Sequence, residues 1–91
     1  MKINFEQFSL YQGLDKHVEI LNVKNVFANE LYNRGQGIAF HALALKIYNS
    51  EGETEYSEME YALMVDFANN CMTPSFIDSL KALKDENESS I

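Results

Sequence analysis

The sequence is poor in the residues that build covalent or metal-bound cores. It contains one cysteine (Cys71), one proline, four glycines and no tryptophan. A lone cysteine cannot form an intramolecular disulfide, so we expect a reducing, cytoplasmic environment. It also excludes a zinc site made from several cysteines. No cationic residue lies near Cys71 in the sequence to activate its thiol, so we expect a small, buried apolar side chain near a helix end.

Long apolar runs and positive charge are also scarce. No apolar run reaches the roughly 18 residues of a membrane span, and no secretory signal is recognisable. Seven Lys and Arg residues stand against 14 Asp and Glu residues, which gives a net charge of −7. Nucleic acids and anionic membranes are bound largely through Lys and Arg, so we expect neither as a direct partner.

Motifs with a known catalytic or metal-binding mechanism are missing as well. The chain has no Gly-x-Ser-x-Gly elbow and no His-Glu-x-x-His pair, and its two histidines, His17 and His41, are far apart. The acidic segment 51–60 lacks the Asp and Gly spacing of a calcium loop. We therefore expect a protein that is not an enzyme and that needs no cofactor or metal.

The length and composition are those of one folded domain. The 91 residues are 46% hydrophobic, which suits a single compact unit. We predict that this domain covers residues 1–84 and that residues 85–91 form an acidic, frayed C-terminal tail.

The first 21 residues have the pattern of short strands. Apolar and polar residues alternate around 3–5, 8–11 and 18–20, which is the period of a half-buried strand. Turn-forming residues at 13–16 lie between the last two segments and predict a hairpin. The break at Gln7 predicts a bulge or a bend.

Helical periodicity follows in the segments 23–34, 37–49, 58–70 and 73 to about 84. Ser57 and Glu60 form a capping-box signature, and Thr73 with Pro74 has the form of a helix start. Gly35 fits the left-handed position after the first helix, and Gly37 would let the next helix pack closely. The predicted class is α+β, mainly α: an N-terminal antiparallel β-hairpin packed on a bundle of three to four short helices.

The segment 37–49 is apolar in nearly every direction around a helix. Such a helix must be covered on all sides, either by its own chain or by a second copy, so we place it at the centre of the fold and expect a homodimer. His41 lies in its middle and is interpreted either as a satisfied core or interface histidine or as a proton-handling or metal-binding residue at a dimer seam. The interface candidates are Ile38, His41, Ala42, Leu45, Tyr48 and Tyr32.

Three functional hypotheses follow. The first is a small, acidic, non-enzymatic protein–protein interaction module that binds itself, another protein or both. The second is an acidic mimic of nucleic acid that inhibits a nucleic-acid-binding enzyme. The third is a small-molecule binder with a pocket between hairpin and helices, using His41 or tyrosines. Compact acidic chains are common among phage and mobile-element genes, so an accessory protein of that origin is one interpretation. The acidic-surface candidates for the second hypothesis are Glu51, Glu53, Glu55 and Glu58.

Overall fold

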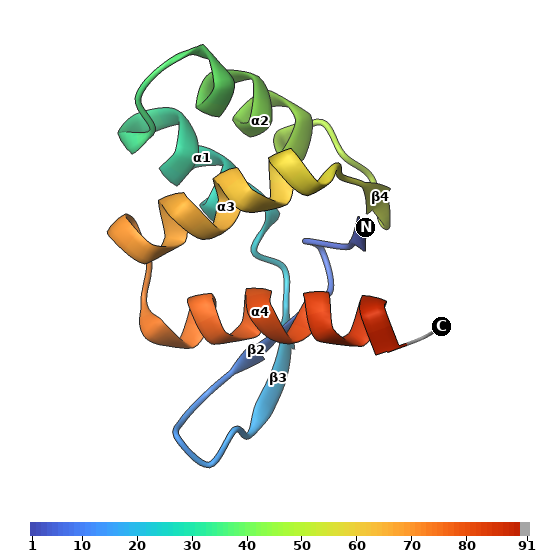
Figure 1. Cartoon of the computed structure of the whole chain (residues 1–91). Helices are drawn as coiled ribbons and strands as arrows, with labels where there is room; N and C mark the ends of the chain where they lie inside the picture. Colours follow the sequence, from blue (N-terminus) through green and yellow to red (C-terminus); the bar gives the residue numbers. More distant parts are fainter. Residues whose placement is uncertain (90–91) are drawn as a thin grey trace.

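The computed structural model describes the backbone of residues 1–89 and the side chains of residues 1–86. Its elements are β1 (Lys2–Ile3), β2 (Phe8–Tyr11), β3 (Val18–Leu21), α1 (Lys24–Arg34), α2 (Ile38–Tyr48), β4 (Thr54–Glu55), α3 (Glu58–Cys71) and α4 (Pro74–Ser89), as Figure 1 shows. The mainly helical α+β class is confirmed, and so is the N-terminal hairpin.

The strands form two separate antiparallel pairs. In the hairpin, β2 pairs with β3, and Phe8 lies opposite Leu21. The break at Gln7 is a bend, in which the Gln7 N–H donates to the Asn4 carbonyl at 3.2 Å. Strand β1 pairs instead with β4, and Lys2 lies opposite Glu55. The acidic segment 51–60 therefore contains a short strand, β4.

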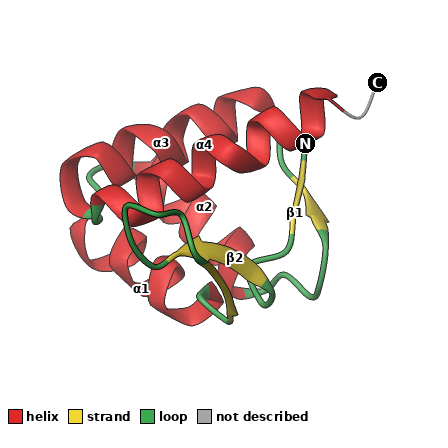
Figure 2. Ribbon diagram, turned by 90° about the horizontal axis from the view of Figure 1, so that it is seen from below, coloured by secondary structure: helices red, strands yellow, loops and turns green. Residues whose placement is uncertain are grey.

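The hairpin packs against α4 through two serines. The Ser75 hydroxyl donates to the Tyr11 carbonyl, and the Ser79 hydroxyl accepts a hydrogen bond from the Tyr11 N–H at 3.0 Å. Ser79 is only 1% exposed, although serine is a polar residue type that is usually exposed. Helix α4 thus covers the edge of β2 that faces away from β3, as the view in Figure 2 also indicates.

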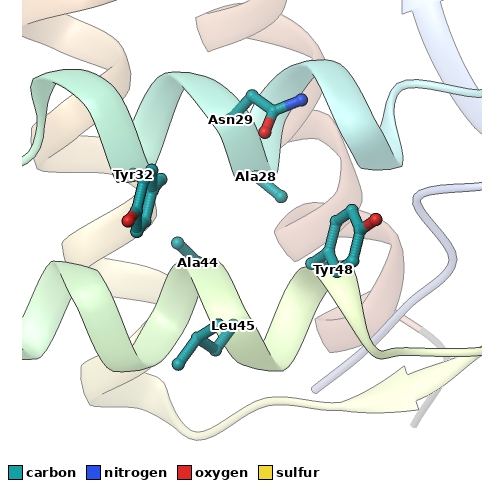
Figure 3. A pocket seen from close by; sticks show the side chains of 6 residues that line it. All are labelled: Ala28, Asn29, Tyr32, Ala44, Leu45 and Tyr48. Carbon is teal, nitrogen blue, oxygen red and sulfur yellow. The ribbon is translucent and has the colours of Figure 1, made fainter.

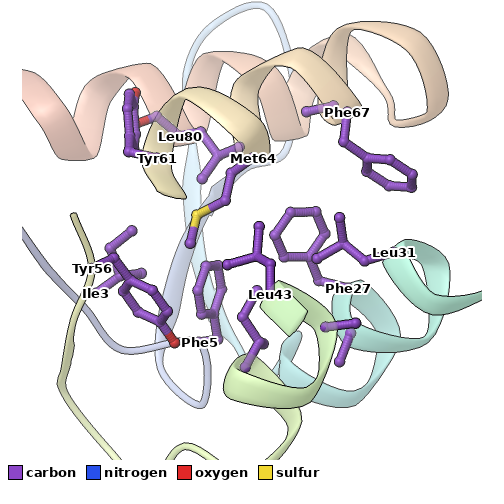
Figure 4. Packing of buried hydrophobic residues seen from close by; sticks show 14 of the residues in the cluster. Ile3, Phe5, Phe27, Leu31, Leu43, Tyr56, Tyr61, Met64, Phe67 and Leu80 are labelled. Carbon is purple, nitrogen blue, oxygen red and sulfur yellow. The ribbon is translucent and has the colours of Figure 1, made fainter. Parts of the chain in front are cut away.

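The core lies between the inner sides of the four helices, β1, the turn before β2 and the segment around Tyr56 (Figure 4). Phe27 is fully buried, and its ring centroid lies 5.4 Å from that of Phe5 and 4.8 Å from that of Phe76. Met64 is also fully buried. Aromatic pairs of this kind contribute about 0.5–1.5 kcal/mol each beyond the area that they bury.

Local start signals of the last two helices are confirmed. The Glu60 N–H donates to the Ser57 hydroxyl at 3.1 Å, and the Ser57 N–H donates to the Glu60 carboxylate at 2.8 Å, which completes a capping box. The Thr73 hydroxyl accepts from the Phe76 N–H at 3.3 Å. Helix α4 continues to Ser89, beyond the predicted end near residue 84. Residues 90–91 of the predicted tail lie outside the described residues.

The two glycines between α1 and α2 exchange their predicted roles. Gly35 has an extended backbone, with φ −68°, and a Cβ there would lie 2.5 Å from the Leu31 carbonyl oxygen and 2.6 Å from Phe40 Cβ. Gly37 is the residue with a left-handed φ of 101°, and a Cβ there would meet nothing within 4 Å. Close packing requires the first glycine, and the backbone turn requires the second.

Candidate functional site

Helix α2 lies at the outside of the molecule, so its predicted central position is wrong (Figure 1). One side, with Leu43, Ala44 and Ile47, is buried. On the other side, Ile38 is 85% exposed and Leu45 is 46% exposed. Helices α1 and α3 cover only the inner side of α2, and no other described element covers the outer one. The expectation that the chain itself encloses this helix is therefore wrong, and only enclosure by a companion is left as a prediction.

The interface candidates all lie on this open side. Positions 38, 41, 45 and 48 recur at the spacing of one helix face, and α1 contributes a tyrosine that lies beside them. Its ring centroid is 5.6 Å from that of His41. All six candidates are exposed, so His41 is not a core histidine. We call this surface the α1/α2 face and define it by Tyr32, Ile38, His41, Ala42, Leu45 and Tyr48.

A shallow groove runs along the α1/α2 face and has a volume of about 230 Å³. Its lining residues are Ala28, Asn29, Tyr32, Ala44, Leu45 and Tyr48. Figure 3 shows the two alanines between the helices, with the tyrosine rings towards the two ends of the groove. The alanines are buried, and their small side chains leave the depression open.

Sequence reasoning missed three of these lining residues, Ala28, Asn29 and Ala44. The pairing of small residues across the two helices could have indicated the groove. The groove is not the predicted pocket between hairpin and helices. A depression of about 210 Å³ does lie between the hairpin and α4, where Tyr11 is one of its lining residues. His41 lines neither of the two.

The α1/α2 face carries no formal charge when His41 is neutral. The cations on these helices are engaged elsewhere. Lys24 donates to the Ser50 carbonyl at 3.0 Å, Arg34 lies 3.0 Å from Glu30, and Lys46 of α2 lies 2.9 Å from Glu60 of α3.

The formal charge of the chain is unevenly distributed. Residues 22–49 carry three cations and one carboxylate, whereas residues 50–91 carry two cations and ten carboxylates. The exposed apolar surface therefore lies on the least acidic part of the chain.

The acidic-surface candidates Glu51, Glu53, Glu55 and Glu58 are all exposed. The terminal amine of Met1 donates to the Glu55 carboxylate at 2.6 Å, and this hydrogen bond lowers the pKa of Glu55. Glu58 lies in the first turn of α3, where a negative charge suits the helix dipole. At least two of the four carboxylates, those of Glu55 and Glu58, thus interact with other parts of the same chain.

Within the described residues, no group of three or more His, Cys, Asp or Glu side chains is arranged to hold a metal ion. Cys71 ends α3 and is half-buried, so its predicted place near a helix end is confirmed but its burial is only partial. No helix in the described part is long and apolar enough to cross a membrane.

Comparison of the chain with family models, curated proteins and solved structures finds no match. The α1/α2 face is therefore the candidate functional site.

Proposed function

We propose that this protein is a non-enzymatic interaction module that associates with a second copy of itself through the α1/α2 face. The observation that supports this proposal is the exposure, on one side of α2, of a continuous row of large apolar and aromatic residues. Surface apolar residues that occur singly are ordinary, but a contiguous group typically marks an interaction site.

The chemistry of the face suits protein–protein contact. Tyr32, Tyr48 and Leu45 present aromatic and aliphatic area beside the groove, and tyrosine is enriched in interface hot spots because it buries area and keeps a polar tip. Removing apolar surface from water lowers the free energy by about 25 cal/mol per Å², before the cost of association is subtracted. Ala42 is small and exposed on the same face, which allows a partner backbone to approach closely.

Several features favour an identical copy as the partner. In a two-fold dimer the same patch contacts itself, so its groups must be complementary to themselves. Tyrosine hydroxyls and the Asn29 amide each both donate and accept hydrogen bonds, and two such groups can satisfy each other. A charged patch would repel its own copy, and the α1/α2 face is uncharged with a neutral His41.

The charge distribution supports the same partner. Each chain carries a net charge of −7, which disfavours random association of two copies. Contact through residues 22–49 uses the least acidic segment and leaves the carboxylates of residues 50–91 on the rest of each copy. This arrangement minimises the repulsion that dimerisation has to overcome.

Sedimentation velocity over a range of concentrations tests the proposal. We expect the native chain to sediment at micromolar concentration as a dimer, with twice the 10.4 kDa mass of one chain. The Leu45→Glu variant should sediment as a monomer. Met59→Glu is the matched control, because Met59 is an apolar residue on α3 that is even more exposed than Leu45 and lies outside the α1/α2 face. Far-UV circular dichroism should show that both variants keep the native helix content.

Two results would contradict the proposal. One is a native chain that stays monomeric throughout the concentration range. The other is a dimer that Leu45→Glu and Met59→Glu weaken to the same extent, because the α1/α2 face would then have no special part in association.

A further inference from the structure

The hairpin has one open edge. It consists of two strands only, β2 and β3. The outer edge of β2 is covered by Ser75 and Ser79 of α4. The outer edge of β3 has no strand partner within residues 1–89. Figure 1 shows the hairpin beyond α4, on the opposite side of the molecule from α2, so this edge is separate from the α1/α2 face.

The register identifies the backbone groups on the open edge. The Tyr11 N–H points towards Ser79 and thus away from β3, and Tyr11 lies opposite Val18. In an antiparallel pair, the backbone N–H and C=O groups of two directly opposed residues either bond to each other or all point outward, away from the partner strand. The N–H and C=O groups of Val18, and of Ile20 two residues later, therefore point outward from the hairpin.

The side chains of β3 leave this edge accessible. Val18 is 44% exposed and Ile20 is 65% exposed, although the strand pattern alone is typical of apolar residues that face a core. Exposed edges are commonly protected by lysine, proline or a bulge. Strand β3 has none of these, and its one charged residue is the exposed Glu19.

We propose that the β3 edge binds an extended segment of another protein, which adds to the hairpin as a third strand. The outward N–H and C=O groups of Val18 and Ile20 supply the main-chain hydrogen bonds of such strand addition. Cross-strand neighbours attract when they are both apolar or oppositely charged. The segment that fits therefore has apolar residues opposite Val18 and Ile20 and a Lys or Arg opposite Glu19.

In the register that aligns the two apolar residues Val18 and Ile20 with each other, a second copy fits this edge poorly. Antiparallel self-pairing that places Val18 opposite Ile20 of the copy also places Glu19 directly opposite Glu19, and like charges at that position are destabilising. The net charge of −7 adds repulsion between copies and favours a basic segment.

Nuclear magnetic resonance of the ¹⁵N-labelled full chain tests the proposal with two capped octapeptides, one of alternating Val and Lys and one of alternating Val and Glu. We expect the Val-Lys peptide to shift the Val18 and Ile20 amide signals and to slow their hydrogen exchange. We expect it to bind at least about fivefold more tightly than the Val-Glu peptide.

Two variants separate the roles of charge and backbone. Glu19→Lys should reverse the preference between the peptides, while Glu53→Lys, with the same charge change outside the hairpin, should leave Val-Lys as the tighter ligand. Ile20→Pro removes one outward N–H and should abolish the binding of both peptides; its circular dichroism must match that of the native chain.

Three results would overturn the proposal. These are equal binding of both peptides, amide shifts centred outside β3, and Val18 and Ile20 amides that are already protected at high concentration without peptide. The last result would identify a second copy as the occupant of the edge.

Discussion

The Ser79 hydroxyl of α4 lies 3.0 Å from the Tyr11 nitrogen of β2 and accepts the hydrogen bond of this N–H group. The same hydroxyl donates to the Ser75 carbonyl at 2.7 Å. One buried side chain therefore joins the C-terminal helix to the N-terminal hairpin, 68 positions apart in the chain.

Replacing Ser79 with alanine should leave the Tyr11 N–H without its partner in a partly buried contact. An unsatisfied buried donor costs about 1–3 kcal/mol, so we expect the free energy of unfolding in urea to fall by about 1 kcal/mol, the lower end of that range. Ser9→Ala, at an exposed serine of β2, should change it by less than about 0.5 kcal/mol. Equal effects of the two substitutions would show that the hydrogen bond does not secure the hairpin.

Two buried tyrosines should respond differently to loss of their hydroxyl groups. The Tyr61 hydroxyl donates to the Leu80 carbonyl at 2.9 Å, so Tyr61→Phe should lower the free energy of unfolding by about 1 kcal/mol. The Tyr56 hydroxyl is buried and has no hydrogen-bond partner in the described part of the chain. Tyr56→Phe should therefore leave the stability unchanged or raise it. Urea unfolding of both variants measures this, and a larger loss for Tyr56→Phe would contradict it.

Alanine substitutions at the two glycines between α1 and α2 should lower the thermal stability by different amounts. Gly35→Ala places a methyl group against the Leu31 carbonyl and Phe40, and overpacking of this kind costs about 1–3 kcal/mol or more. Gly37→Ala meets no atoms but strains a backbone with φ 101° and ψ 168°, a region that essentially only glycine adopts, at a cost of about 1–3 kcal/mol. Thermal unfolding should give the lower midpoint for Gly35→Ala. The opposite order would mean that the close approach at Gly35 relaxes easily.

Acid should weaken the contact between α2 and α3. Partial burial acts to raise the pKa of Glu60, but hydrogen bonds from Ser57 and Lys46 outweigh it, so the pKa lies below its ordinary value of 4.5. The unfolded chain therefore takes up this proton first as the pH falls. The stabilisation by ionised Glu60 is complete well above pH 4.5 and is lost as the pH drops through the lower folded pKa.

Glu60→Gln should flatten this part of the stability profile. Urea unfolding between neutral pH and about pH 3 should show a smaller loss of stability for Glu60→Gln than for the native chain. Glu58→Gln, at an exposed position of the same turn, serves as the control and should keep the native slope more closely. Parallel profiles of Glu60→Gln and the native chain would exclude Glu60 as a source of the acid sensitivity.

Features that depend on neighbours in sequence could be predicted from the sequence. The capping box of Ser57 and Glu60 requires residues three positions apart, and the turn at residues 13–16 lies within one hairpin. These interactions form wherever the segment is placed, so the helices and the hairpin followed from local patterns. Part of the α1/α2 face could also be predicted, because its residues on α2 recur with the period of one helix face.

Features that depend on distant segments could not be predicted in this way. The pairing of β1 with β4 joins residues more than 50 positions apart, and no local pattern specifies it. Ser79 is a polar residue type that is usually exposed, yet the hairpin edge requires its hydroxyl in a buried position. Helix α2 lies at the periphery because the chain supplies neighbours for only one side of it. The apolar pattern of the helix alone did not predict this position.

Contact between two α1/α2 faces is tested most directly by isotope-filtered nuclear Overhauser spectroscopy on a mixture of labelled and unlabelled chains. Signals that pass from the Leu45 methyl groups of one copy to tyrosine rings of the other, and that vanish in Leu45→Glu, are the expected result. A spectrum of the concentrated protein with no signals between copies, or with signals only from residues outside the α1/α2 face, would contradict the proposal.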